Sequence, residues 1–251
     1  MRDKYAQGEW TQMQRLDKYL SEAGVESRRK LRDMIRAGRV SVNGAVMREP
    51  EGKLDEKTAV VTLDGVPVAA GNRRVVLMMN KPAGCVTAAR DRDFPTVMEH
   101  LPPEYAKLMP IGRLDKDTEG LLLFTNDGDL AHRLLAPKRH IEKTYYAEHL
   151  GTVTEEDIRV FREGCVLREG VRCLPAVLEP IGEGRSIIRV CEGKYHQVRR
   201  MMASRRLPVI YLRRVAAGGV ELGELPLGMT RELTEEEISG LESVNFDEKF
   251  F

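Results

Sequence analysis

The residues best suited to chemistry lie in the run from Gly112 to Gly128, which reads GRLDKDTEGLLLFTNDG. Its first half carries three carboxylates, Asp115, Asp117 and Glu119, and its second half is an apolar segment typical of a buried strand. A charged loop held by a buried strand is a common position for a catalytic carboxylate. The residues alone leave three other roles open, because these acids could hold a divalent cation, form the acid pair of a glycosidase, or make a turn.

The run resembles the signature G-R-L-D-x-x-T-x-G-L-L-L-x-T-N-D-G of the pseudouridine synthases, in which the aspartate is essential. Other segments similar to the family's motifs follow in the expected order within residues 75–240: N-K-P-A-G at 80–84, K-T-Y at 143–145, E-G-K-Y-H-Q-V-R-R-M at 192–201, L-R-R at 212–214 and L-G-M-T-R-E-L at 227–233. The resemblance implies an isomerase that detaches a uracil in RNA, rotates it and rejoins it through carbon 5. That reaction has no redox step, so the resemblance implies neither a cofactor nor a metal.

The resemblance assigns catalytic roles to three residues. Asp115 falls on the essential aspartate and would act as a nucleophile, or as a base and electrostatic partner. Arg199 would form an ion pair with Asp115, because a nearby positive charge favours the carboxylate and orients it. Tyr145 would stack on the uracil extruded from the RNA and take part in proton transfer, with a core aromatic as its structural alternative.

Further residues of these motifs are expected at the RNA: Lys81, Arg113, Lys143, His196, Gln197 and Arg200. Arg113 is placed to fill the space left by the extruded base or to hold a phosphate. The lysines are expected at phosphates. His196 and Gln197 are expected mainly to make supporting hydrogen bonds where a helix starts.

Residues 15–65 carry a different pattern. Apolar spacing predicts helices at about 15–23 and from Ser27 to Gly38, and alternation predicts strands at 39–44 and 58–63 that end in Asn-Gly and Asp-Gly turns. R-L-D-K-Y-L-x-x-A-G-V-x-S-R-R followed by I-R-A-G-R-V-S-V-N-G resembles the alpha-L RNA-binding module, first known from a small-subunit ribosomal protein. By position, the resemblance implies phosphate contacts by five arginines on and after the second helix: Arg28, Arg29, Arg32, Arg36 and Arg39.

The charge distribution favours RNA contact although the formal net charge is only +1. Residues 15–48 carry nine Lys or Arg against four acids, and residues 185–214 carry nine against one. Residues 221–251 carry two bases and nine acids, which conceal the basic blocks in the total. Because polyanion binding depends on local patches, the two basic blocks outweigh the near-neutral sum.

The pattern of elements predicts an α+β protein, with a small alpha-L RNA-binding domain and a pseudouridine synthase catalytic domain built on a mixed, mostly antiparallel β-sheet. The expected strands of the second domain are 75–80, 121–125, 143–149, 164–168, 173–179, 186–191 and 209–214. The expected helices are 95–101, 128–135, 154–163, 195–204 and 234–241, two of them begun by Thr154 and Thr234. The domain boundaries we expect are a disordered lead-in at 1–14, the alpha-L domain at 15–65, a linker at 66–74, the catalytic domain at 75–241 and an acidic tail at 242–251.

The composition also indicates the cellular setting. No apolar stretch is long enough to cross a membrane, and the polar first residues give no sign of secretion. The four cysteines form no C-x-x-C pair, which fits a reducing compartment. We therefore expect a cytoplasmic protein, acting as a monomer and without a membrane partner.

The joining of an alpha-L module to this catalytic domain is similar to the ribosomal small-subunit pseudouridine synthase A family. The similarity implies modification of one uridine of small-subunit (16S) rRNA, the equivalent of uridine 516, with rRNA or the assembling small subunit as partner. Three alternatives stay open: the same reaction on large-subunit (23S) rRNA, a non-catalytic RNA-binding factor for ribosome assembly, and a metal-dependent nuclease that uses Asp115 and Asp117.

Overall fold

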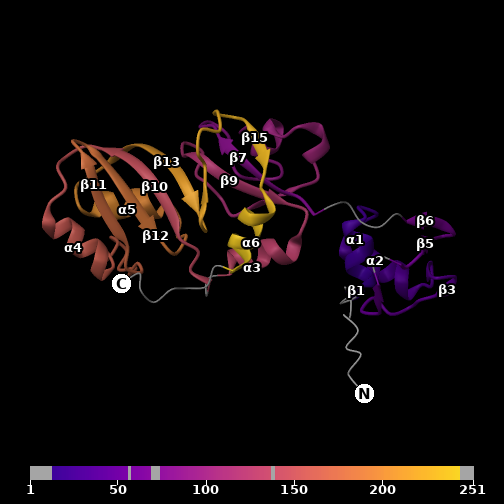
Figure 1. The fold of residues 1–251 in the computed structure, drawn as a ribbon. Coiled ribbons are helices and arrows are strands. Elements are labelled where there is room, and N and C mark those ends of the chain that lie inside the picture. Colours follow the sequence, from indigo (N-terminus) through magenta and orange to yellow (C-terminus); the bar gives the residue numbers. More distant parts are fainter. Residues whose placement is uncertain (1–12, 56–57, 69–73, 137–138, 244–251) are drawn as a thin grey trace, which may run out of the picture. The chain divides into compact units, whose positions relative to one another are not determined.

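The chain divides into two compact units, residues 1–74 and 75–251 (Figure 1). The structure is a computed structural model that describes residues 13–55, 58–68, 74–136 and 139–243. Most of the expected lead-in and acidic tail, and residues 69–73 of the expected linker, lie outside these ranges. Each unit is described by itself below.

The first unit packs two helices against short antiparallel strands. The helices are α1 (Leu16–Glu22) and α2 (Arg28–Arg36). A four-stranded sheet has the order β3-β2-β5-β6, with bounds Ala45–Val46, Val40–Val42, Val61–Leu63 and Val66–Val68. A separate antiparallel pair joins β1 (Met13–Arg15) to β4 (Lys53–Asp55).

The apolar spacing read from the sequence forms the core of this unit. Leu16, Tyr19 and Leu20 of α1 pack with Leu31 and Ile35 of α2 in one buried cluster. Both predicted turns have two successive residues with positive φ, as a two-residue hairpin of type I′ requires. Residues 66–68, expected in the linker, instead pair with β5; an edge strand accepts the proline at position 67 because one side of it needs no backbone donor.

The second unit is built on a nine-stranded sheet. Its main order is β11-β12-β10-β13-β9-β7-β15, with bounds Val177–Gly182, Arg185–Val190, Lys143–His149, Val209–Ala217, Glu119–Thr125, Val76–Lys81 and Thr230–Glu232. Two short strands pair at the side of this path, β8 (Met109–Ile111) with β9 and β14 (Val220–Glu221) with β13. The strand pairs of the described sheet are antiparallel except β9 with β13, so the predicted mixed, mostly antiparallel sheet is confirmed.

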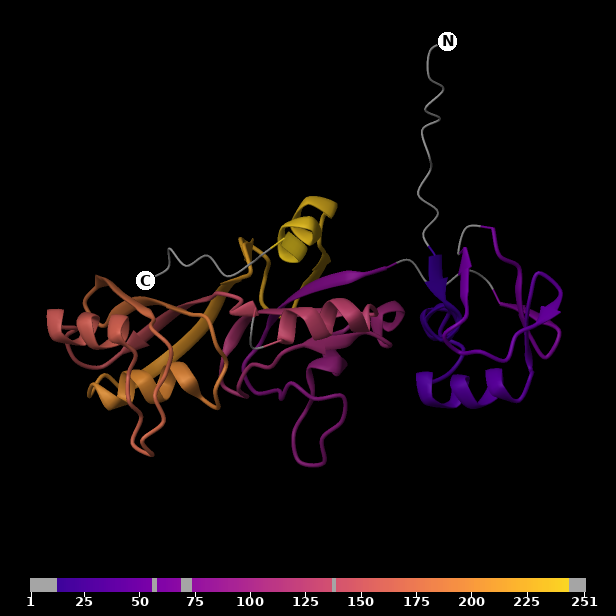
Figure 2. The same ribbon diagram turned by 90° about the horizontal axis from the view of Figure 1, so that it is seen from below.

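Both faces of this sheet are buried, as the alternation of side chains along β7 shows. Leu77 and Met79 belong to one apolar cluster, whereas Val76 and Met78 belong to another. Helices α4 (Glu155–Glu163) and α5 (Gln197–Ser204) supply side chains to the first cluster. Helices α3 (Gly128–Leu135) and α6 (Glu235–Ser243) supply the second, on the opposite face (Figure 2).

The helix starts follow from local chemistry. Thr154 caps α4 and exchanges hydrogen bonds with Asp157 in a capping box. Thr234 and Glu237 make the same two bonds at the start of α6.

Three expected elements differ from the structure. Residues 164–168 form only an isolated bridge, Val166 to Arg172, and β11 begins at Val177 rather than near 173. Residues 95–101 hold a 3-10 helix, Val97–His100, instead of an α-helix. In the first case the apolar pattern comes from Cys165, Leu167 and Cys173, which pack into the core from irregular backbone.

Candidate active site

Asp115 lies in the loop between β8 and β9, where its side chain is 28% exposed. The loop leads into β9, whose second residue, Gly120, has a φ of +103°. A Cβ atom there would lie 2.2 Å from the backbone oxygen of Arg214 on the paired strand β13, so only glycine allows this close approach. The close approach of β9 and β13 therefore fixes one end of the loop that carries Asp115.

The side chain of Lys81 bonds the backbone of the same loop. Its side chain is fully buried, and its Nζ donates to the backbone oxygens of Pro82 at 2.9 Å, Lys116 at 3.3 Å and Thr118 at 3.0 Å. Burial lowers the pKa of this lysine. The expectation that Lys81 meets an RNA phosphate is wrong in this structure, because its buried ammonium group already bonds the Pro82 oxygen and two loop oxygens that follow Asp115.

The N-K-P-A-G segment adds further bonds to the loop. The Gly84 backbone N–H donates to the Lys116 oxygen at 2.8 Å. The hydroxyl of Thr87 donates to the Leu114 oxygen at 3.0 Å and accepts from the Leu114 N–H at 3.1 Å. Together with Lys81, these bonds make the backbone around Asp115 rigid without occupying its carboxylate.

The start of α5 faces Asp115. His196 lies just before this helix in the left-handed conformation, with φ 47° and ψ 36°, and its Nε2 is 3.5 Å from Oδ1 of Asp115. Its ring stacks on Tyr195, with 3.8 Å between the ring centres. Tyr195 is 76% exposed, so the stacked pair presents a flat aromatic surface to solvent beside the carboxylate.

Arg199 contacts a different acid from the one expected. Its Nη2 is 3.1 Å from Oδ2 of Asp117, and it also donates to the Asp117 backbone oxygen at 3.4 Å. Nη1 donates to the Val209 oxygen at 3.3 Å, while the buried Nε has no hydrogen-bond partner within the described residues. The expected ion pair with Asp115 is therefore wrong in this structure: where α5 crosses the loop, Arg199 reaches Asp117.

Tyr145 lies on the core side of β10 and is 9% exposed. It shares an apolar cluster with Leu114 and Val198, the neighbours in sequence of Asp115 and Arg199. Tyr146 points to the other face, where its ring meets Tyr211 edge-on at 6.2 Å between centres. Strand alternation thus directs Tyr145, and not Tyr146, toward the segments that carry Asp115 and Arg199.

Three other residues expected at RNA lie in different environments. Gln197 is buried, and its amide bonds Glu192 at 2.7 Å and the Lys194 N–H at 2.9 Å, so it makes supporting hydrogen bonds at the start of α5. Arg200 pairs with Glu169 and donates to the Tyr195 oxygen at 3.0 Å. Arg113 is exposed, with no ion pair to any described residue.

Lys143 lies at the start of β10 and is partly buried. Its Nζ donates to the Ile141 oxygen at 2.8 Å. Burial, aided by the nearby Arg214, lowers the pKa of Lys143 to about 8. A contact of Lys143 with an RNA phosphate stays a prediction.

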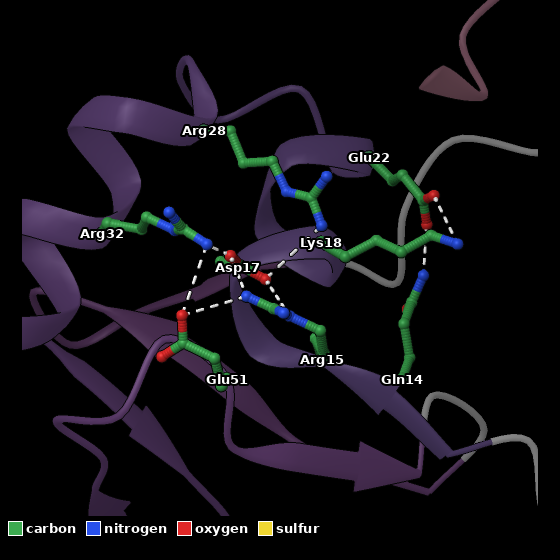
Figure 3. Close-up of polar contacts among 8 residues, drawn as sticks. All are labelled: Gln14, Arg15, Asp17, Lys18, Glu22, Arg28, Arg32 and Glu51. Carbon is green, nitrogen blue, oxygen red and sulfur yellow. Dashed lines mark hydrogen bonds and ion pairs between the residues drawn. The ribbon is translucent and has the colours of Figure 1, made fainter. Parts of the chain in front are cut away.

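In the first unit, one arginine of β1 and two of α2 surround one acid (Figure 3). Asp17 has no exposed side-chain area, and it accepts from Arg15 at 2.9 and 3.0 Å and from Arg32 at 3.1 Å. Arg28 Nη2 lies 3.7 Å from the same carboxylate. Although burial alone raises it, hydrogen bonds from Arg15 and Arg32 hold the pKa of Asp17 below its ordinary value.

The five arginines expected at phosphates are thus in different states. Arg28 and Arg32 pair with Asp17 on one side and are 45% and 41% exposed on the other. Arg36 lies 3.9 Å from Asp33 and is 61% exposed, and Arg39 pairs with Asp64. Arg29 is exposed, with no ion pair to a described residue.

The sequence interpretation missed Tyr195 and Asp17. Tyr195 lies inside the E-G-K-Y-H-Q-V-R-R-M segment, and an aromatic residue beside His196 was the available signal. Its exposure depends on the turn before α5. Asp17 lies in R-L-D-K-Y-L on the helix face next to Leu16 and Leu20, where a buried acid needs nearby arginines.

The described residues contain no group of three or more His, Cys, Asp or Glu side chains placed to hold a metal ion. No helix among them is long and apolar enough to span a membrane.

Comparison with known proteins agrees with this geometry. Residues 75–204 match the RNA pseudouridylate synthase family, and residues 14–60 match the S4 domain, the alpha-L module of the sequence analysis. The chain therefore belongs to the RNA pseudouridine synthases, and it carries an amino-terminal S4 domain that binds RNA.

Individual relatives cover nearly the whole chain. A Bacillus subtilis protein described as an uncharacterized RNA pseudouridine synthase, YtzG, is 41% identical over 89% of this chain and 96% of its own length. Ribosomal small subunit pseudouridine synthase A of Escherichia coli is 39% identical over 90% of this chain and 99% of its own length. A crystal structure of a pseudouridylate synthase superposes with a TM-score of 0.65 at 34% identity, covering 90% of this chain and 99% of that one.

Proposed function

We propose that this enzyme converts one uridine of small-subunit (16S) rRNA to pseudouridine, at the equivalent of uridine 516. The observation that carries the target is the similarity along almost the full length of both chains to the small-subunit enzyme of Escherichia coli. The S4 domain alone does not distinguish a small-subunit from a large-subunit rRNA target, whereas the full-length similarity favours the small subunit. The partner we propose is rRNA or the assembling small subunit, met in the cytoplasm by a monomeric enzyme.

Asp115 is the catalytic residue of this proposal. The reaction breaks the N1–C1′ bond and forms a C5–C1′ bond, while the hydrogen on C5 is lost to water and N1 gains a proton. A carboxylate can serve it as a nucleophile or as a base and electrostatic partner. Asp115 suits these roles because Lys81 and Thr87 fix its backbone while its side chain remains 28% exposed.

The residues around Asp115 receive supporting roles. Tyr145 stacks on the extruded uracil from the core side, and the exposed ring of Tyr195 stacks on a neighbouring base. Arg199 positions the loop through Asp117, at a distance of 3.1 Å. Arg113, exposed two residues before Asp115, fills the space left by the base or holds a phosphate.

A modification map tests the target. In a strain that lacks this gene, pseudouridines of both rRNAs are labelled with a carbodiimide and read as stops of reverse transcription. The proposal predicts loss of a single small-subunit stop, and its return when the wild-type gene, but not an Asp115→Asn copy, is restored. Loss of a large-subunit stop with the small-subunit stop intact would overturn the assignment.

A further inference from the structure

Two carboxylates engage the same two arginines of the S4 domain from opposite sides (Figure 3). Arg15 donates Nη2 both to Asp17 at 2.9 Å and to Glu51 at 3.1 Å. Arg32 donates Nε to Asp17 at 3.1 Å and Nη2 to Glu51 at 3.3 Å. The guanidinium groups are thus held between one acid on α1 and one acid on the turn before β4.

The two acids differ in accessibility. The Asp17 side chain is fully buried, so neither water nor a ligand reaches it. The Glu51 side chain is 54% exposed and lies on a short turn closed by a bond from the Gly52 N–H to the Glu49 oxygen at 3.0 Å. An exposed ion pair of this kind contributes little to stability, typically about 0 to 1 kcal/mol.

Arg15 and Arg32 also line a basic groove on the surface of the domain. The groove has a volume of about 550 Å³, and its lining residues are Arg15, Arg28, Arg29, Arg32, Asp33 and Arg36. An RNA phosphate in this groove needs the outward-facing donors of the lining arginines. Glu51 is not itself a lining residue, but the Nη2 atoms that it engages belong to Arg15 and Arg32, two of the lining arginines.

We infer that Glu51 occupies the place of an RNA phosphate and is displaced when RNA binds, while Asp17 stays in place and positions the arginines. The inference rests on the RNA-binding role of the S4 domain in the proposed function. Glu51 is in this account a competing anion: it keeps Arg15 and Arg32 ordered in the free protein and weakens their binding of phosphate. The net charge of this cluster, three guanidinium groups and two carboxylates, is +1 in the free protein and rises to +2 when Glu51 leaves.

We expect the Glu51→Gln variant to bind RNA more tightly than the wild-type protein. The test measures the affinity of the full chain for a fluorescent transcript of Escherichia coli 16S rRNA by anisotropy, over a range of salt concentrations. Removing a carboxylate that competes at contact distance should lower Kd by about threefold or more at 0.1 M salt, and by less as salt screens the charges. The fall of affinity with salt should also become steeper, because in the variant Arg15 and Arg32 bind phosphate without first giving up a carboxylate partner.

Glu22→Gln supplies the matched control. Glu22 lies in the same domain, where it contacts Gln14 and Lys18, but unlike Glu51 it forms no ion pair with Arg15 or Arg32 (Figure 3). The variant removes the same charge, so it measures the long-range effect alone. Equal affinities for the two variants, or weaker binding by Glu51→Gln, would overturn the inference.

Asp17→Asn should change the RNA affinity in the opposite direction. With the buried carboxylate neutralised, Arg15, Arg28 and Arg32 lose their common anchor, and RNA binding should weaken; tighter binding would contradict the permanent role of Asp17. These assays read binding and not turnover. A failed rRNA modification map would therefore leave the Glu51 result interpretable, and a failed Glu51 result would leave the modification map standing.

Discussion

His196 Nε2 lies 3.5 Å from Oδ1 of Asp115, so among the described residues the basic side chain within 4 Å of this carboxylate is an imidazole at the start of α5. His196 is held there by a left-handed backbone and by stacking on Tyr195. Arg199, one turn further along α5, contacts Asp117 instead. The helix thus contacts the loop at two points, while the Asp115 side chain stays 28% exposed.

Arg199 should act on catalysis through the loop rather than on RNA affinity. We expect Arg199→Met to lower kcat by about 100-fold, since an error of about 1 Å in the position of a catalytic group has that effect, with RNA Kd nearly unchanged. Arg199→Lys should recover part of kcat, because it restores the charge but not the geometry in which Nη2 contacts both the side chain and the backbone oxygen of Asp117. Single-turnover kinetics and anisotropy measure the two quantities separately. A variant that changes only Kd would contradict the positioning role.

Tyr195 should contribute to RNA binding by stacking. Its ring is 76% exposed beside His196, and stacking of a base on an aromatic ring contributes about 1–3 kcal/mol. Tyr195→Ala should therefore raise RNA Kd by about tenfold, a value inside that range, whereas Tyr195→Phe should bind like the wild-type protein. Anisotropy with the same transcript compares them. If Phe and Ala behave alike, the hydroxyl or the backbone matters and the stacking role is wrong.

Lys81 should stabilise the fold as well as the loop. Lys81→Met leaves three carbonyl oxygens without their buried donor, and we expect the free energy of unfolding in urea to fall by about 2–4 kcal/mol. Lys116→Met is the matched control on the same loop, because its Nζ only covers the Phe94 ring, 3.4 Å from the ring centre. The control should lose no more than about 1 kcal/mol. Similar losses in both variants would show that the buried bonds of Lys81 contribute little.

Lys143 gives a prediction about pH. Its pKa in the folded protein, about 8, lies below the ordinary 10.5, so the protonated form opposes folding below pH 8 and this cost fades as pH rises toward 10.5. Lys143→Met should therefore be more stable than the wild-type protein at pH 7, by up to about 3 kcal/mol, and its advantage should shrink through this window. Lys143→Arg, which stays charged, should keep the cost at every pH. Urea unfolding from pH 7 to 10 measures the differences, and an advantage of Lys143→Met that is independent of pH would contradict the account.

Much of the fold follows from local patterns. The sequence predicts α3 at 128–135 and β10 at 143–149, and both form with these bounds. The Asn43-Gly44 and Asp64-Gly65 pairs predict both hairpin turns of the first unit, because two successive left-handed residues are needed there. These elements depend on neighbours in sequence, which the sequence displays directly.

The errors concern contacts between segments distant in sequence. Lys81 resembles a solvent-exposed phosphate ligand until the loop at 115–120 folds over it. Whether Arg199 meets Asp115 or Asp117 depends on where α5 crosses that loop, since the two acids are only two residues apart. Residues 164–168 carry a strand-like apolar pattern, but the partner strand is missing and only one bridge forms. In each case the deciding interaction is tertiary.

The central claim is that Asp115 catalyses the isomerisation, and release of tritium from RNA labelled at carbon 5 of uridine tests it most directly. The substrate is an Escherichia coli 16S rRNA transcript, and the enzymes are the wild-type protein, Asp115→Asn and the neighbouring charge-matched control Asp117→Asn. We predict no release by Asp115→Asn despite near-normal RNA binding, and clear though reduced release by Asp117→Asn, which removes only the contact with Arg199. Release by Asp115→Asn at the wild-type rate would contradict the account.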